Sequence, residues 1–429
     1  MPKLQDVFVA GGLPTVTYVP RTEHKLEDAL RDYLFQRHKI LSVSGPTKSG
    51  KTVLVRRLLP KDKAFWISGG QAATADAFWQ LVLGHLGGHT TTEISTSEGA
   101  AQESTQKYAA GIKPAGIGAE AQASTKDISN SQQTRQRSRT VNPAIAALTG
   151  LVSAGIPLVI DDFHYIDKAI QKEIIRSLKE PIFEGLPVIL ISVPHRAFDA
   201  VRVEKEMTGR VSHLQIPAWT TDELAEIPLV GFSALNASCG SEITDMLQRQ
   251  AFGSPHLMQD FCLELGRLNQ LWETVQNLGL VHAPEAWDAF FRDRAADTSK
   301  SAFERLAKGP RQRTDRIPRI LVNGKTCDIY VAILLAIAHT GPKISLTYED
   351  IRAGLKAVLK DELPQSNEVT RILEKMSEIA QKEIEGEPVV DWDKEYSTLH
   401  ISDPFFAYYL RWGVEPPLKL ETEGSLPLG

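Results

Sequence analysis

A glycine-rich stretch near the N-terminus carries a lysine and a threonine at a fixed spacing. Gly45 is followed by Gly50, Lys51 and Thr52, so the stretch satisfies the pattern G-x-x-x-x-G-K-[ST]. The glycines let the backbone turn so that successive N–H groups point inward and bind phosphate oxygens. The ammonium group can reach the β- and γ-phosphates, and the hydroxyl can enter the octahedral shell of Mg²⁺. The pattern therefore predicts a site for ATP and its magnesium ion.

The residues expected to bind the nucleotide are contiguous. An apolar segment precedes them and a segment with helical spacing follows, as the motif requires. A chance glycine-rich turn is the alternative, but it leaves these flanks and a downstream acidic partner unexplained. Lys51 is also a catalytic candidate, because it can neutralise charge on the transferred phosphate. The predicted nucleotide-binding residues are Gly45, Pro46, Thr47, Lys48, Ser49, Gly50, Lys51, Thr52 and Val53.

The acidic partner is a pair of aspartates that follows the apolar run PLVI. Asp161 is expected to bind Mg²⁺ together with Thr52, usually through water. Asp162 is expected to orient or polarise the attacking water, which makes it the catalytic candidate. The alternative for Asp162 is a loop or helix-capping acid, because DDFHYIDKAI also leads into a helix. His164 is expected to pack or cap locally.

Strand and helix patterns alternate from residue 39 to about 216, which predicts an α/β domain with a parallel sheet covered by helices. In such a sheet a buried strand delivers its terminal carboxylate to the edge that carries the phosphate loop. The expected strands are 40–44, 64–68, 157–161, 187–192 and 212–216. The expected helices are 51–59, 72–86, 142–154 and 168–179.

Helical patterns dominate the rest of the chain. Thr220 and Glu223 form a T-x-x-E capping box, after which short helices predict a lid. Helical patterns at 327–341, 347–359 and 367–383 are followed by extended pieces at 388–392 and 397–402. Three helices with a β-hairpin resemble a winged helix.

The segment 87–140 interrupts the α/β pattern and contains almost no large apolar residues. It is expected to be disordered or a thin β-hairpin, with an ordered contact arm as the alternative. Three arginines in QQTRQRSRT could contact DNA or acidic partners, although a solvated linker is commoner. The expected division is an N-terminal segment 1–38, an ATPase core 39–218 with this insertion, a lid and connector 219–320, and a winged-helix domain 321–429.

These motifs in this order resemble the AAA+/STAND group of P-loop ATPases. The glycine-rich pattern, LVIDD, a fourth strand ending in ISVPH, GR and a helical lid carry the likeness. Origin-recognition/Cdc6-like ATPases, the transposition ATPase TniB and prokaryotic STAND ATPases are the suggested relatives. The resemblance implies a P-loop three-layer fold with a helical lid and a mostly α winged-helix domain.

The same resemblance implies an adenine side. YVPRTEHKLEDAL is similar to the group's N-terminal adenine motif, which assigns Val19, Pro20 and Arg21, with proline where the group has glycine. In the lid, FGSPHLMQDF resembles the G-x-P motif, which assigns Pro255 and His256 after Gly253. A glycine helix stop followed by a helix that begins at proline also explains these residues, and it is compatible with contact to the nucleotide base. No clear sensor 2 arginine stands there.

Two further catalytic candidates come from the resemblance. Ser192 occupies the sensor 1 place at the end of the fourth strand, with His195 just beyond. A strand-end hydroxyl satisfied by the backbone is the equal alternative. Arg210 matches the place of an arginine finger that enters a neighbouring subunit's site. A solvated surface arginine is the commoner reading of that position.

The C-terminal module is expected to contact protein in preference to DNA. Its candidate recognition helix mixes lysine and arginine with four glutamates, and its wing is acidic, so both would bind phosphates poorly. The tail ISDPFFAYYLRWG resembles the ending of many prokaryotic STAND-type ATPases, and its aromatic side chains are expected to dock onto the winged helix.

Composition sets broad limits. The chain has 429 residues, which predicts two or three domains, and a net charge of −5, which gives no overall basic field. Three scattered cysteines fit a reducing cytoplasm, and no stretch reaches the ~18 apolar residues of a membrane span.

The leading expectation is an ATP- and Mg²⁺-binding ATPase that hydrolyses slowly and acts as a conformational or assembly switch. Homo-oligomerisation, or a complex with a separate effector protein, follows from the resemblance, as does a role in phage defence. A DNA-binding loader or adaptor is the alternative, and a nucleotide-locked scaffold is the third hypothesis.

Overall fold

A computed structural model describes residues 1–71, 73–87, 91–96, 135–140, 142–193, 204, 207, 209–295, 299–310, 317–341, 343–360, 362–384 and 388–414. The chain divides into two compact units. The α/β unit contains Thr22–Gly45 and Lys51–Ile216, and the C-terminal unit contains Met1–Arg21, Pro46–Gly50 and Pro217–Gly429. The predicted four-part boundaries stay predictions, but one difference is notable: five residues of the glycine-rich loop group with the C-terminal unit.

The α/β unit is built on a five-stranded parallel sheet with the order β2-β5-β6-β1-β7. All five predicted strands are present, which confirms the α/β fold class. The strands are β1 (Ile40–Ser44), β2 (Phe65–Ser68), β5 (Leu158–Asp161), β6 (Val188–Ser192) and β7 (Val211–Gln215).

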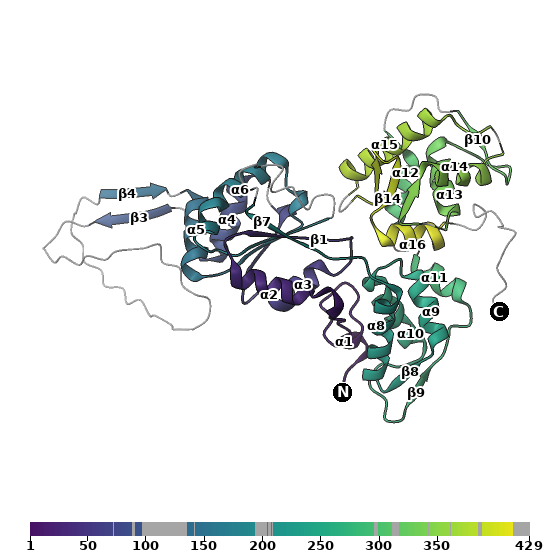
Figure 1. The fold of residues 1–429 in the computed structure, drawn as a ribbon, viewed down its shortest axis with the longest axis horizontal. Coiled ribbons are helices and arrows are strands. Elements are labelled where there is room, and N and C mark those ends of the chain that lie inside the picture. The colour runs from purple at the N-terminus through teal and green to yellow at the C-terminus, as the bar shows by residue number, and fades with distance from the viewer. Residues whose placement is uncertain are drawn as a thin grey trace, which may run out of the picture. The chain divides into compact units, whose positions relative to one another are not determined.

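Helices cover both faces of this sheet, which is why its strands are apolar throughout (Figure 1). Along β6, Val188 and Leu190 join the core with α4, α5 and α6, whereas Ile189 and Ile191 join the core with α2 and α3. The helices are α2 (Leu26–Gln36), α3 (Lys51–Leu58), α4 (Ala75–His85), α5 (Pro143–Ala154) and α6 (Lys168–Phe183), with short 3₁₀ turns η1 (Thr22–His24), η2 (Gly69–Gln71) and η3 (Phe163–Tyr165).

The ends of the insertion form a two-stranded antiparallel hairpin. Strand β3 (Thr91–Thr96) pairs with β4 (Arg135–Thr140) in a register that joins Thr91 to Thr140 and Thr96 to Arg135. The predicted contact role of residues 97–134 lies outside the described residues. The pairing of β3 with β4 agrees with the predicted β-hairpin at the two ends of the insertion.

The N-terminal residues and the lid form one core of the C-terminal unit. The predicted capping box is observed: Thr220 accepts from the Glu223 N–H, and the Glu223 carboxylate accepts from the Thr220 N–H. Its elements are α1 (Leu4–Val7), α8 (Thr221–Ala234), β8 (Ala237–Cys239), α9 (Ser241–Gln250), α10 (Pro255–Leu268), β9 (Gly279–Val281) and α11 (Trp287–Ala295).

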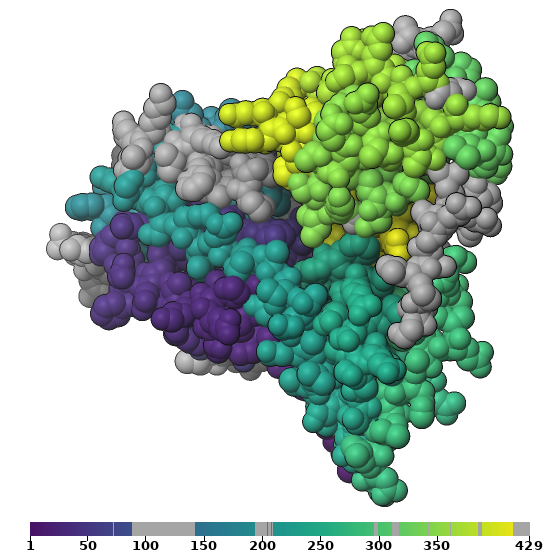
Figure 2. Space-filling model, turned by 45° about the vertical axis from the view of Figure 1, so that its right-hand side comes forward, coloured from purple at the N-terminus to yellow at the C-terminus, as the bar shows by residue number. Residues whose placement is uncertain are grey.

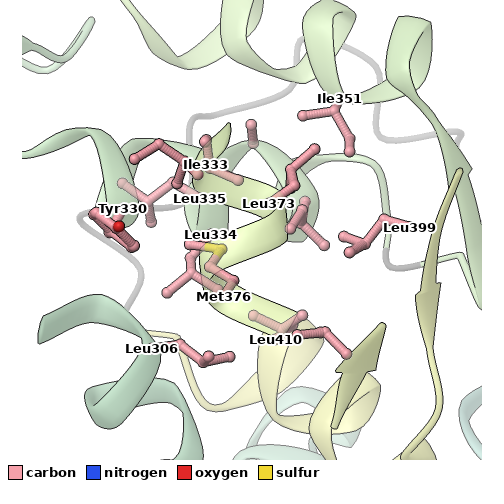
Figure 3. Packing of buried hydrophobic residues seen from close by; sticks show 14 of the residues in the cluster. Leu306, Tyr330, Ile333, Leu334, Leu335, Ile351, Leu373, Met376, Leu399 and Leu410 are labelled. Atoms are coloured by element: carbon pink, nitrogen blue, oxygen red, sulfur yellow. The ribbon is translucent and has the colours of Figure 1, made fainter. Parts of the chain in front are cut away.

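The remaining elements form a second core around α13, whose buried leucine and isoleucine side chains are shown in Figure 3. Three helices and a three-stranded antiparallel sheet of order β12-β14-β13 occupy the region predicted as a winged helix. The elements are α12 (Lys300–Lys308), β10 (Arg319–Ile320), β11 (Thr326–Cys327), α13 (Ile329–His339), β12 (Ser345–Thr347), α14 (Tyr348–Val358), α15 (Ser366–Lys382), β13 (Val390–Asp393), β14 (Thr398–Ile401) and α16 (Pro404–Trp412).

Helix α16 belongs to both cores of the C-terminal unit. Phe406 and Leu410 pack into the core around α13, whereas Tyr408 is buried in the lid core and donates its hydroxyl proton to the Phe291 carbonyl at 2.7 Å. The space-filling view shows the C-terminal elements, in lime and yellow, against the teal and green lid (Figure 2). The tail therefore docks on the lid as well as on the predicted winged helix.

Candidate nucleotide-binding site

The glycine-rich loop connects the end of β1 to the start of α3. Lys48 and Gly50 have φ values of 60° and 92°, in the left-handed region that glycine adopts without strain. Helix α3 begins at Lys51, so the N–H groups of its first turn and its positive dipole end directly follow the loop. This local geometry is the one that the phosphate-binding pattern requires.

The Lys51 side chain folds back on its own loop. It is only 7% exposed, and its Nζ donates to the Gly45 carbonyl at 2.9 Å. A phosphate bound where the motif predicts it would accept hydrogen bonds from this ammonium group, and such charge-assisted bonds are strong.

The two predicted magnesium ligands lie together at one edge of the sheet. The Thr52 hydroxyl donates to both carboxylate oxygens of Asp161, at 3.2 and 3.1 Å. Burial raises the pKa of Asp161, and the neighbouring charge of Asp162 raises it further, whereas the hydrogen bond from Thr52 lowers it. A cation bound here would offset both the burial of the carboxylate charge and its repulsion by Asp162.

These donors fit Mg²⁺, because hydroxyl and carboxylate oxygens are hard ligands. Within the described ranges there is no group of three or more His, Cys, Asp or Glu side chains that could hold a metal. Mg²⁺ bound with a triphosphate does not need such a group, since it keeps waters and takes phosphate oxygens. Thr52 and Asp161 are therefore the residues that would hold it.

The backbone at Asp162 is in a sharp turn. Its φ of 54° is unusual for a residue with a side chain, and the residue opens the 3₁₀ turn η3 without capping it. Helix α6 is capped by Asp167, whose carboxylate accepts from the Ala169 N–H at 2.8 Å. Asp162 therefore caps neither η3 nor α6, whereas its place in this turn is compatible with the loop alternative.

Two buried residues hold this turn in place, and sequence reasoning did not find them. The Gln171 side-chain amide donates to the Phe163 carbonyl at 3.0 Å. A Cβ on Gly69 would lie 2.4 Å from the Asp162 carbonyl oxygen, so only glycine fits there. Only tertiary contact assigns these roles, because neither residue lies in a recognised motif.

Ser192 ends β6 directly beside Ser44, the residue that precedes the loop. It is 2% exposed, and its hydroxyl has no hydrogen-bond partner among the described residues. The alternative of a hydroxyl satisfied by neighbouring backbone is therefore not observed. The prediction for His195 lies outside the described residues.

Arg210 is exposed and precedes β7, where its carbonyl accepts from the Ile40 N–H at 2.9 Å. Ile40 begins β1, whereas the phosphate loop follows its end, so Arg210 lies at the opposite edge of the sheet. Five strand residues span about 16 Å. Arg210 is thus remote from its own chain's loop, a placement that suits either a neighbour's site or solvent.

The predicted adenine-side residues of the N-terminus differ in exposure. Val19 is buried in the lid core, and Pro20 is exposed. Arg21 is 6% exposed and donates to a carboxylate oxygen of Glu223 at 2.7 Å and to the carbonyls of Pro217 and Ala218 at 3.0 Å. The Arg21 charge is thus bound within the lid.

The lid residues surround His256. Pro255 is the first residue of α10, capped by Ser254 and preceded by Gly253 with a φ of 69°. Burial lowers the pKa of His256, and the charge of Lys48 lowers it further. The His256 ring meets Phe405 edge-on, with centroids 4.9 Å apart.

His256 also lines a cavity of about 910 Å³. Several carboxylates share its wall, which opposes the binding of phosphate there. The acidic lining residues are Asp260, Glu264, Glu285 and Asp293.

Lys48 and Ser49 of the loop contact other parts of the C-terminal unit. The Lys48 ammonium lies 5.9 Å from the centroid of the Phe405 ring, and the Trp219 indole donates to the Ser49 carbonyl at 2.9 Å. Trp219 was not predicted as a site residue. Its only sequence signal is its place directly before the capping box of α8.

The class of fold follows from comparison with solved structures. A Walker-type ATPase of Pyrococcus abyssi is similar over 92% of this chain and 96% of its own, with 13% identity and a TM-score of 0.51. This similarity shows an α/β P-loop NTPase-like fold followed by a helical C-terminal part.

Two further solved structures are similar to this chain at lower TM-scores. Cdc6p of Pyrobaculum aerophilum is 13% identical, with a TM-score of 0.42 over 95% of this chain and 97% of its own. A STAND protein of Pyrococcus horikoshii with a tetratricopeptide repeat sensor is 12% identical, with a TM-score of 0.33 over 91% of this chain and 42% of its own. No family model matches the chain. No curated protein matches it either.

Among the described residues, no helix combines the length and apolar character needed to cross a membrane.

Proposed function

We propose that this chain binds ATP with Mg²⁺, hydrolyses it slowly and uses the bound nucleotide as a switch. The hydrogen bonds between Thr52 and Asp161 are the observation that carries the proposal, because they join the loop motif to a distant carboxylate. A chance glycine-rich turn would not place its threonine on that carboxylate. The buried Lys51 ammonium supplies the matching charge for phosphate.

Five side chains of the α/β unit have distinct parts in the proposed hydrolysis. The magnesium ion, held by Thr52 and Asp161, would neutralise charge on the phosphates. Lys51 exchanges the Gly45 carbonyl for phosphate oxygens. Asp162 orients the attacking water, and the Ser192 hydroxyl, which has no partner among the described residues, donates to the γ-phosphate.

The switch requires that nucleotide binding change contacts elsewhere. Residues Pro46–Gly50 make their contacts with the lid and α16, so a ligand that orders this loop acts on those contacts. A change of assembly with a second copy or an effector protein follows as a proposal from the AAA+/STAND resemblance. Phage defence rests on the resemblance alone, and no contact in the described chain bears on it.

The DNA-binding alternative is less favoured, because charged side chains around α15 pair within the protein. Lys375 pairs with Glu378 at 2.7 Å, and Lys394 pairs with Glu374 at 3.0 Å. These pairs reduce the field available to a phosphate backbone. In this proposal the predicted winged helix therefore packs against protein and does not bind DNA.

The test is calorimetric titration with ATP and Mg²⁺, combined with mass measurement in ADP, in ATP and without nucleotide, each with and without duplex DNA. Wild-type protein should bind ATP and change mass, and Lys51→Ala should do neither, whereas Lys61→Ala at an exposed lysine should behave as wild type. Asp162→Asn should bind ATP but lose turnover. Absence of ATP binding by the wild type would refute the proposal, and equal turnover in Asp162→Asn would leave only a scaffold.

A further inference from the structure

The glycine-rich loop receives a hydrogen bond from outside its own motif. The indole Nε1 of Trp219, just before α8, donates to the carbonyl oxygen of Ser49 at 2.9 Å. Ser49 is 4% exposed, so this carbonyl lies where water is largely excluded. Trp219 stands 170 residues away in the sequence and belongs to no predicted nucleotide motif.

The Trp219 ring is itself held in place. The guanidinium of Arg21 lies 4.8 Å from the ring centroid, and Arg21 has a left-handed backbone with a φ of 49°. The three hydrogen bonds of Arg21 reach Glu223 and the carbonyls of Pro217 and Ala218, the two residues that directly precede the tryptophan. Glu223 is also part of the α8 capping box. The indole donor is therefore fixed to the lid on several sides.

This donor determines the orientation of one peptide unit. In a trans peptide the C=O and N–H groups point in opposite directions. Holding the Ser49 carbonyl toward Trp219 therefore aims the Gly50 N–H to the opposite side of the peptide, away from the indole. Gly50 has a φ of 92° and no side chain to restrict this peptide, so an external hydrogen bond has to hold it.

We propose that Trp219 is a positioning residue that preorganises the Gly50 N–H for phosphate binding. This inference rests on the proposed nucleotide-binding function and deepens it. Trp219 does not touch the nucleotide but acts through the Ser49–Gly50 peptide. Without the indole donor the peptide samples other orientations, and binding must then order it.

The test compares wild type with Trp219→Phe, which keeps a ring beneath Arg21 but removes the N–H. Affinities for ATP and ADP should both fall about fivefold to tenfold, as expected for one hydrogen bond to the loop. The turnover number at saturating ATP should stay within about twofold, because ground state and transition state lose the same binding. The melting temperature without nucleotide should stay close to that of wild type.

Fluorescence gives a second readout that a purely structural role would not move. Nucleotide should change the indole emission of wild type and of Trp272→Phe, whose tryptophan is 60% exposed. The change should be absent in Trp219→Phe. A benzothienylalanine at position 219 removes only the N–H and keeps the ring size, so it tests the same bond if the phenylalanine variant does not fold.

The outcomes separate this inference from the proposed function. If wild type binds ATP and both 219 variants bind it equally well, the positioning role is wrong while the nucleotide site stands. If wild type does not bind ATP at all, the proposed function itself is refuted. A loss of affinity confined to the 219 variants supports the role.

Discussion

At the scale of single residues, Asp161 and Ser192 at the edge of the sheet both lower the stability of the fold. The Asp161 carboxylate is buried next to Asp162, and the Ser192 hydroxyl is buried without a partner among the described residues. Groups that cost stability persist where function needs them. Both residues therefore give variants that separate stability from activity.

Asp161→Asn should weaken magnesium-dependent binding without destabilising the protein. Because the folded protein raises the pKa of Asp161, folding favours its protonated form, and the stability that this form contributes at low pH is lost as pH rises through the folded pKa, where the buried charge becomes a cost. At neutral pH the neutral variant should melt at or above the wild-type temperature. The gain in ATP affinity that Mg²⁺ provides should fall about 10–100-fold. Titrations with Mg²⁺ and with EDTA measure this, and a variant that keeps the full gain would exclude Asp161 from the metal site.

Ser192→Ala should lower turnover while leaving nucleotide affinity unchanged. The Ser192 hydroxyl, which has no partner in the described part of the chain, would bond to the γ-phosphate in this mechanism, so its loss should cost at least about tenfold in kcat. Removing a buried unsatisfied hydroxyl should raise stability by up to about 1 kcal/mol. Single-turnover hydrolysis and thermal melting provide the measurements. A stability loss with unchanged kcat would point to an ordinary packing role.

At the scale of elements, the turn after β5 depends on the neighbouring turn after β2. Gly69 in η2 lies against the Asp162 carbonyl at the start of η3, and Gln171 of α6 holds the same turn from the other end. The position of Asp162 is therefore set by three elements that are separate in sequence. A change in η2 should reach the site through this contact.

Gly69→Ala should disturb the site, because its Cβ would lie 2.4 Å from the Asp162 carbonyl oxygen. The displacement should destabilise the protein by about 1–3 kcal/mol and reduce turnover more than nucleotide affinity. Gly70→Ala is the matched control, since its Cβ meets nothing within 4 Å. Denaturant unfolding and steady-state hydrolysis compare the pair. Equal behaviour of the two variants would show that η2 can shift without moving η3.

The elements that periodicity and motif order define were predictable from the sequence. Continuous apolar runs mark the five strands, and their ends bring Thr52 and Asp161 to one edge. The roles of Gly69 and Trp219 were not predictable, because close approach and a side-chain bond to a carbonyl leave no periodic signal. The sequence predicted that the aromatic tail docks onto the winged helix alone. Helical spacing cannot show that different faces of α16 pack into two separate cores.

At the scale of the whole chain, residues far apart in sequence converge on the glycine-rich loop within the C-terminal unit. Trp219 from the lid entry and Phe405 from α16 contact Ser49 and Lys48, and the Phe405 ring also meets His256. The N-terminal segment joins them through Arg21. The loop thus contacts both the lid and helix α16, so a nucleotide bound to the loop could change these contacts, as a nucleotide switch requires.

Phe405→Leu should strengthen nucleotide binding by up to about fivefold, because a cation–π contact of about 0.5–1 kcal/mol no longer competes with phosphate for Lys48. Phe405 is only partly buried in the lid core, so leucine should keep α16 in place. Lys48→Gln should weaken binding by itself, and in that background Phe405→Leu should have no further effect. This double-mutant cycle isolates the pair, since independent sites would give additive changes. Calorimetric ATP affinities of the four proteins measure the coupling, and additivity would mean that α16 does not act on the loop through Lys48.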